Sequence, residues 1–304
     1  MSVSRLQLAL SLGVGIVAIS SASILIRFAQ AEAPTLTIAA WRLTVASLIL
    51  VPFAWLTCRR ELRRLTRQEW RYLAAAGVFL GFHFAAWISS LGYTSVASSV
   101  VLVSMGPLFV GLGSWVFLRE RLARDTALGI LLAATGSVLV GWSDFGGGRD
   151  QLLGDVLALT GAVMIAGYLM IGRHVRSRLS LTAYIAPVYG VAMLCLWLLV
   201  AITQPQVVGF GPATYGWIVA LGLVPQLIGH STLNWALAHL SATFVSIITL
   251  AEPVGSGILA YLILGEAITL LAAGGGVLIL VGIYMASRAE ARLAKTLRIE
   301  EVLP

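Results

Sequence analysis

The stretch between Arg71 and Arg119 decides the fold, because its 47 residues include no Asp, Glu, Lys or Arg. It reads YLAAAGVFLGFHFAAWISSLGYTSVASSVVLVSMGPLFVGLGSWVFL (residues 72–118). A helix needs roughly 20 apolar residues to cross the hydrocarbon core of a bilayer. The stretch is therefore long enough for two crossings, with a tight turn near Tyr93-Thr94-Ser95 between them.

The composition of the whole chain agrees with a membrane protein. Of the 304 residues, 59% are hydrophobic and 11% are charged, and the mean hydropathy is +0.94. Soluble domains carry about 25% charged residues, which help to cover the core with a polar surface. The composition therefore excludes a soluble globular domain, and its apolar content excludes a disordered chain.

Charge-free stretches along the chain predict an all-α integral membrane fold with ten transmembrane helices. The longest, between Arg178 and Glu252, folds more than once, with turns at Thr203–Ala213 and Ala238–Ser241. The predicted helices span residues 6–27, 35–57, 72–92, 97–118, 126–143, 154–172, 181–203, 214–237, 243–264 and 267–287. A cleaved signal peptide is the alternative interpretation of residues 6–27, but their length and their counterpart in the second half favour a retained helix.

The distribution of Lys and Arg predicts the orientation, because positive residues stay on the cytoplasmic side. With the N-terminus inside, all but three of the 20 Lys and Arg residues fall on cytoplasmic segments; the exceptions are Arg27, Arg42 and Arg149. Both termini are therefore expected in the cytoplasm, with the chain in a bacterial-type inner or plasma membrane. The net charge of +7 follows from this topology and gives no argument for nucleic-acid binding.

Two copies of one unit follow each other at an offset of 146 residues. The matches include Pro107 with Pro253, Glu120 with Glu266, Gly129 with Gly275, and Gly136 with Gly282. The expected division is a first five-helix unit at 1–143, an outer linker at 144–153, a second unit at 154–287 and a cytoplasmic tail at 288–304. Because five is odd, the second unit enters the membrane from the opposite side, which predicts a 5+5 inverted-topology repeat with a site between the halves.

The matched segments resemble a known family. The stretch Pro107-Leu-Phe…Phe117-Leu-Arg-Glu120 and its twin Glu252-Pro253-Val…Leu264-Gly265-Glu266, each followed by two glycines seven residues apart, are similar to the EamA-type signature of the drug/metabolite transporter superfamily. The resemblance covers nearly the whole chain. It implies a ten-helix 5+5 fold that exports or exchanges small metabolites such as amino acids. The first copy has Gly106 where the second copy has Glu252. Any role that the resemblance implies for the glutamate of the Glu-Pro pair therefore applies only to Glu252.

Matched polar residues predict a substrate pocket between the halves. His83 and Trp87 are four residues apart and share a helix face, as do His230 and Asn234, and the two pairs correspond at an offset of 147. Histidine can move protons, asparagine can bind both ends of a zwitterion, and tryptophan can stack on a ring or cation. The alternative is hydrogen bonding between helices, which contributes about 0.6 kcal/mol on average.

Charged residues within the spans are further candidates. Glu252 is the only acid deep in a predicted helix, so it is expected either to bind a proton or a substrate amine, or to form a structural ion pair with Arg42. Arg42, next to Trp41, is expected either to hold a substrate carboxylate or to extend its long side chain toward the membrane surface. Tyr168 and Gln226 are additional candidates for the pocket.

Pro107 and Pro253 are predicted to interrupt helices at equivalent places and to act in gating, although membrane helices also tolerate proline without a functional role. Glu120 and Glu266 are predicted to be structural, at the starts of helices.

The leading function is a secondary active transporter that works by alternating access, with a proton as one candidate coupling ion. It is expected to act as a monomer on a small-molecule substrate. No Gly-x-x-x-x-Gly-Lys-Ser/Thr motif is present, and no cofactor, metal site or enzyme activity is expected. The alternatives are an antiporter of phosphorylated sugars or nucleotide-sugars, which would need more buried cations than Arg42, and a membrane scaffold that transports nothing.

Overall fold

The computed structural model describes residues 4–94, 96–117, 123–142, 149–203, 206–265 and 269–300, and all regular structure in these ranges is helical. The elements are α1 (Arg5–Ser20), α2 (Ala22–Ala29), α3 (Thr35–Arg63), α4 (Arg67–Ser90), α5 (Val96–Val103), α6 (Gly106–Phe117), α7 (Arg124–Trp142), α8 (Arg149–Arg176), α9 (Leu181–Thr203), α10 (Pro212–Leu221), the π-helix η1 (Gly222–His230), α11 (Ser231–Ala236), α12 (Ala242–Ile248), the 3₁₀ turn η2 (Thr249–Ala251), α13 (Glu252–Leu264) and α14 (Leu270–Glu300).

The chain is a multi-pass membrane protein. Seven helical segments of the described chain are long and apolar enough to cross a bilayer. The exterior of these segments is apolar; the exposed leucines include Leu56 on α3, Leu194 on α9 and Leu262 on α13. Because lipid chains solvate such side chains as well as a protein core does, this exterior is compatible only with a membrane.

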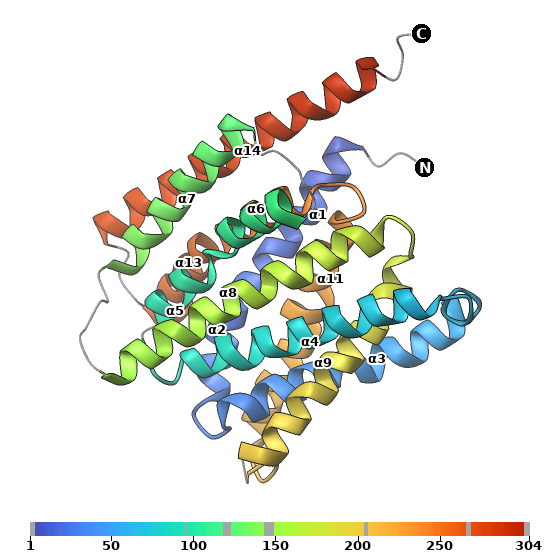
Figure 1. Cartoon of the computed structure of the whole chain (residues 1–304). Coiled ribbons are helices and arrows are strands. Elements are labelled where there is room, and N and C mark those ends of the chain that lie inside the picture. The colour runs from blue at the N-terminus through green and yellow to red at the C-terminus, as the bar shows by residue number, and fades with distance from the viewer. Residues whose placement is uncertain are drawn as a thin grey trace.

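Figure 1 shows three layers of helices: α3, α4 and α9 on one side, α8 with α1, α5, α6 and α13 next to them, and the pair α7 and α14 along the far edge. The start of α1 and the end of α14 lie toward the same end of the bundle.

Described helices overlap all ten predicted ranges, but ten membrane crossings stay a prediction, because seven described segments are long and apolar enough to cross. Two bounds of the predicted units differ. α8 begins at Arg149, inside the predicted linker at 144–153, and α14 continues to Glu300, through most of the predicted tail. Charged residues end a hydrophobic run without ending a helix, so the charge-free count is shorter than the helix. Ser95, Glu120 and Glu266 lie outside the described residues.

Two glycines form equivalent helix contacts between the halves. A Cβ atom added to Gly77 on α4 would lie 2.6 Å from the Cβ of Val191 on α9. A Cβ atom added to Gly222, at the start of η1, would likewise lie 2.6 Å from the Cβ of Val45 on α3. Val45 and Val191 are 146 residues apart, so the same close contact between the halves occurs twice, with the roles of the halves exchanged.

The π-helix η1 accounts for a change in the repeat offset. Gly77 and Gly222 are 145 residues apart, whereas His83 and His230 are 147 apart. The second half therefore contains two extra residues between these positions, and η1 spans them. Because a π-turn closes an i→i+5 hydrogen bond, it holds about one residue more than an α-turn, and two such turns absorb the insertion.

The pair α7 and α14 crosses at glycines. A Cβ on Gly129 would lie 2.7 Å from the carbonyl oxygen of Gly282, and one on Gly136 would collide with the carbonyl oxygen of Gly275. The two helices run antiparallel, and exchanging residues 146 apart converts one contact into the other. Only glycine permits this separation of two backbones.

Candidate functional site

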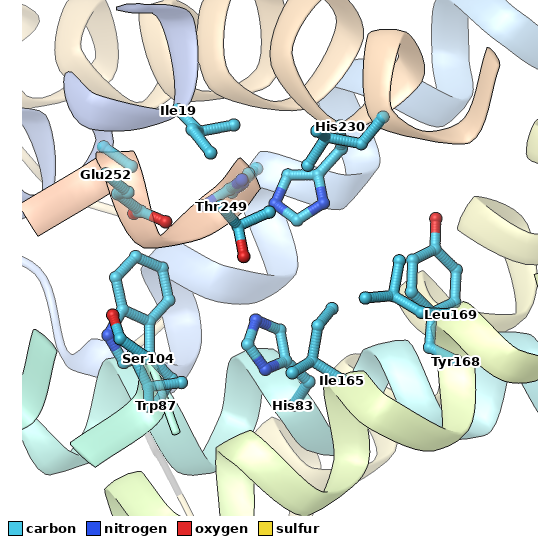
Figure 2. A pocket seen from close by; sticks show the side chains of 14 residues that line it. Ile19, His83, Trp87, Ser104, Ile165, Tyr168, Leu169, His230, Thr249 and Glu252 are labelled. Carbon is cyan, nitrogen blue, oxygen red and sulfur yellow. The ribbon is translucent and has the colours of Figure 1, made fainter. Parts of the chain in front are cut away.

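A cavity of about 60 Å³ lies between the two halves, and it collects most of the predicted site residues. Its wall includes residues of α3, α4 and the α5–α6 break from the first half, and of α8, η1, η2 and α13 from the second. Six predicted site residues line it: Arg42, His83, Trp87, Tyr168, His230 and Glu252. Figure 2 shows His83 and His230 facing each other across it, with Glu252 pointing in from one side.

Arg42 is completely buried, so its side chain does not extend to the membrane surface, which was one of the two expectations. Its Nε donates a 2.9 Å hydrogen bond to Oε1 of Gln226, and its guanidinium carbon lies 4.2 Å from the ring centroid of Phe84. Neither terminal guanidinium nitrogen has a partner. A buried charge with unsatisfied donors is costly, and a carboxylate bound in a bidentate manner would satisfy both nitrogens.

Glu252 begins α13 and lines the same cavity as Arg42. Among the described residues no hydrogen bond joins the two side chains, since neither terminal nitrogen of Arg42 has a hydrogen-bond partner. The N-terminal position of Glu252 suits a carboxylate, because the helix dipole is positive there. The backbone around it is fixed by α1: the Ser20 hydroxyl contacts the carbonyl oxygen of Glu252 at 3.5 Å, and the Ser256 hydroxyl donates to the carbonyl oxygen of Ser20 at 3.0 Å.

Aromatic rings form one wall of the cavity. His83 donates from Nδ1 to the carbonyl oxygen of Gly161 at 2.9 Å, so in the neutral ring Nε2 is the acceptor. Trp87 stacks on His83 with ring centroids 6.0 Å apart, and its indole N–H has no partner. Phe84 contacts His230 edge-on at 5.2 Å. The wall therefore offers an N–H donor and an imidazole acceptor beside the charged groups.

Two predicted site residues lie away from the cavity wall. Asn234 is completely buried behind it, where its Nδ2 donates to the carbonyl oxygen of His230 at 2.8 Å and to the hydroxyl of Tyr189 at 3.4 Å. Trp41 donates from its indole nitrogen to the carbonyl oxygen of Val207 at 2.9 Å and contacts Trp197 edge-on. Trp41 therefore connects α3 to the segment after α9.

The two prolines that match between the repeats lie next to the cavity rather than inside continuous helices. Pro107 is the second residue of α6 and Pro253 the second residue of α13, positions where a missing N–H removes no helical hydrogen bond. The breaks before them bring Ser104 and Thr249 to the cavity wall. Our sequence interpretation missed these two hydroxyls; the available signal was a Ser or Thr about one turn before each matched proline.

Cavity-lining ionisable groups between two similar halves of a membrane protein are the arrangement of a membrane transporter. The family comparison agrees: the model of the EamA-like transporter family matches residues 8–142 and again residues 152–288. The chain belongs to this family and is a membrane transporter of the drug/metabolite type.

Relatives cover most of this chain at low identity. An uncharacterized transporter of Archaeoglobus fulgidus is 25% identical over 86% of this chain and 91% of its own length. The pseudopaline exporter CntI of Pseudomonas aeruginosa is 26% identical over 87% of this chain and 90% of its own. A crystal structure with 21% identity matches the fold with a TM-score of 0.78, over 95% of this chain and 99% of that one.

Proposed function

We propose that the protein is a secondary active transporter that exports or exchanges amino acids or similar small zwitterionic metabolites by alternating access. The observation that carries the proposal is the guanidinium of Arg42, completely buried at the cavity with both terminal nitrogens unpartnered. A carboxylate would bind to these nitrogens, and Glu252 on the same cavity would receive an ammonium group or a proton.

The cavity volume supports a closed state of the transport cycle. Sites for drug-sized ligands enclose about 300–1,000 Å³, whereas this cavity measures about 60 Å³. A metabolite therefore enters only when the helices around the cavity separate. The breaks before Pro107 and Pro253 border the cavity and would allow the two segments of each interrupted helix to move separately.

The proposal includes ten crossings in a 5+5 inverted repeat, with both termini in the cytoplasm of a bacterial-type inner membrane. Support comes from the matched contacts of Gly77 and Gly222, from the antiparallel glycine crossing of α7 and α14, and from the bias of Lys and Arg. In such a repeat the outward-open and inward-open states exchange the roles of the two halves.

A proton is the proposed coupling ion, with Glu252 as its carrier. The Glu252 carboxylate would bind either the ammonium group of the substrate or a proton, so that the two would compete for one group. An antiporter of phosphorylated sugars is the weaker candidate, because the described part of the chain brings one arginine, Arg42, to the cavity.

Counterflow in proteoliposomes tests the function. Vesicles loaded with one unlabelled zwitterionic amino acid should accumulate the same labelled compound, and the Glu252→Gln variant should lose acceleration by a pH gradient while retaining exchange. A correctly folded protein that exchanges no member of a panel of amino acids and amino-acid derivatives would contradict the proposal and favour a scaffold.

A further inference from the structure

A set of buried polar side chains lies behind the cavity, entirely within the second half. We call it the polar cluster; it consists of Tyr168, Tyr184, Tyr189, Gln226, Ser231 and Asn234. Each of the six side chains is at most 9% exposed. The three tyrosines belong to α8 and α9, which are long and apolar enough to cross a membrane. Polar groups at this depth are costly unless they have partners.

Hydrogen bonds connect the polar cluster to the cavity. Arg42, on the cavity wall, donates to the side chain of Gln226 at 2.9 Å. The hydroxyl of Ser231 contacts the carbonyl oxygen of Gln226 at 3.5 Å and shares a 3.4 Å hydrogen bond with the hydroxyl of Tyr189. The amide of Asn234 then donates to Tyr189 at 3.4 Å. These contacts lead from the substrate site into the second half.

The other end of the polar cluster lies at the C-terminal end of α8. Nε of Arg176, the last residue of α8, donates to the carbonyl oxygen of Asn234 at 2.9 Å. This end of α8 lies beside the end of α3, since Glu61 accepts hydrogen bonds from the backbone N–H and hydroxyl of Ser180. We call this surface the arginine-rich face; its arginines are Arg59, Arg60, Arg63, Arg64, Arg173 and Arg178.

Four polar atoms of the polar cluster lack a hydrogen-bond partner. They are the hydroxyls of Tyr168 and Tyr184, Nε2 of Gln226 and Oδ1 of Asn234. The rings of Tyr168 and Tyr184 stack with centroids 6.4 Å apart. Donors and acceptors are both present, and Tyr168 also lines the cavity. Water is the ligand that satisfies such a mixed set, since a buried water makes about three hydrogen bonds.

The first half has no equivalent of the polar cluster. At the offset of 146 residues, Ala22, Ile38 and Leu43 stand where the second half has Tyr168, Tyr184 and Tyr189. In an inverted repeat these positions border the path from the site to the opposite membrane face. The path toward the arginine-rich face therefore has three tyrosine hydroxyls that its counterpart lacks.

We propose that the polar cluster is a hydrated access route between the arginine-rich face and the substrate site, and that the counterpart route through Ile38 and Leu43 excludes water when the site is closed. Water and polar solutes reach Arg42 from the arginine-rich face along this route. The inference rests on the alternating-access function proposed above, but hydration can be measured without any knowledge of the substrate.

Cysteine accessibility tests the route. The background replaces the two native cysteines (Cys58→Ser, Cys195→Ala), and single variants Tyr184→Cys and Asn234→Cys are compared with Ile38→Cys, the equally buried counterpart of Tyr184. A charged, membrane-impermeant methanethiosulfonate reagent is added to one side of sealed vesicles at a time. Ser177→Cys and Val208→Cys report full access on the arginine-rich and opposite faces.

From the arginine-rich face, Tyr184→Cys and Asn234→Cys should react at least about tenfold faster than Ile38→Cys does from either face, because the reactive thiolate and the charged reagent both need water. Having two variants keeps the test valid if one fails to insert. Equal reactivity of Ile38→Cys, or no reaction of either variant while Ser177→Cys reacts, would overturn the route. Labelling in the expected pattern, with no counterflow of any tested compound by the cysteine-free parent, would instead contradict the proposed transport function and leave the route intact.

Discussion

Arg42 illustrates how a single side chain defines the chemistry of the site. One of its nitrogens is held by Gln226, which leaves the two terminal nitrogens for a ligand. A buried charge with unsatisfied donors costs stability, whereas binding of a substrate carboxylate depends on that charge. Stability and transport should therefore respond differently to substitution here.

The Arg42→Gln variant tests substrate recognition. We expect the KM of counterflow to rise by about 30-fold or more, because loss of one partner of a buried charged pair costs about 2–5 kcal/mol. The thermal stability of the detergent-solubilised protein should not fall. Arg64→Gln on the arginine-rich face is the matched control and should keep the wild-type KM; equal effects of both variants would contradict a direct role of Arg42.

Glu32, which follows α2, makes a pH-dependent contact outside the spans. Its carboxylate accepts from the backbone N–H of Gly211 at 2.6 Å and from the hydroxyl of Thr214 at 2.9 Å, and these bonds lower its pKa. A lowered folded-state pKa stabilises the protein above the unfolded value, near 4.5, and this contribution is lost as the pH falls through the folded value.

Melting temperatures measured from about pH 6 down to about pH 3 should therefore show the wild type losing its advantage over Glu32→Gln as the pH falls. A constant difference between the two proteins across this range would exclude the contact as a source of pH dependence.

The sequence predicted which residue types line the site better than it predicted their directions. Arg42, His83, Trp87, Tyr168, His230 and Glu252 line one cavity, and their role in binding stays a prediction. The direction of the Asn234 side chain was inferred from the geometry of an ideal α-helix. The residue follows η1, however, and the wider turns of a π-helix change the angle between successive side chains. Trp41 contacts a segment more than 160 residues away, which no local pattern contains.

At the scale of elements, glycine contacts determine how closely helices approach. Gly129→Ala would place a Cβ atom against the backbone of Gly282, which cannot move as a flexible side chain can. We expect a loss of about 1–3 kcal/mol of stability, measured as a lower melting temperature in detergent. Gly274→Ala is the control on α14, since no atom lies within 4 Å of the added Cβ. Equal effects of both variants would contradict the crossing.

The prolines permit a second test of elements. In Pro253→Ala the restored N–H lets η2 and α13 join into one continuous helix, so counterflow should slow while the substrate Kd, measured by equilibrium binding, stays unchanged. Pro212→Ala, also in the first turn of a helix but away from the cavity, should leave both quantities unchanged. A changed Kd in Pro253→Ala would favour a role in binding rather than gating.

Element positions were predictable because hydrophobic runs and charges follow the membrane thickness. The π-helix was not predicted. The sequence nevertheless contains a signal for it, because the offset between the repeats changes from 145 residues at Gly77 to 147 at His83. Two extra residues in an apolar helix alter neither its hydropathy nor its charge, so only the comparison of the two halves contains the signal.

At the scale of the whole molecule, the inverted repeat makes a prediction about equivalent positions. Ala31 and Ser177 are 146 residues apart, each just after the first candidate span of its half. Cysteines at these two positions should react with an impermeant reagent from opposite sides of the membrane, and so should cysteines at Arg64 and Val208. Reaction of either pair from the same side would exclude the inverted arrangement.

The two-residue insertion in η1 has a consequence for the energetics of the unloaded carrier. Perfect copies would give two end states of equal free energy, populated equally in a symmetric bilayer. Since α4 lacks the wide turns of η1, the helices pack differently in the two end states. Each free-energy difference of about 1.4 kcal/mol between these states changes the ratio of their populations about tenfold. The resting protein should therefore favour one orientation, and so present its binding groups preferentially to one compartment before any gradient is applied.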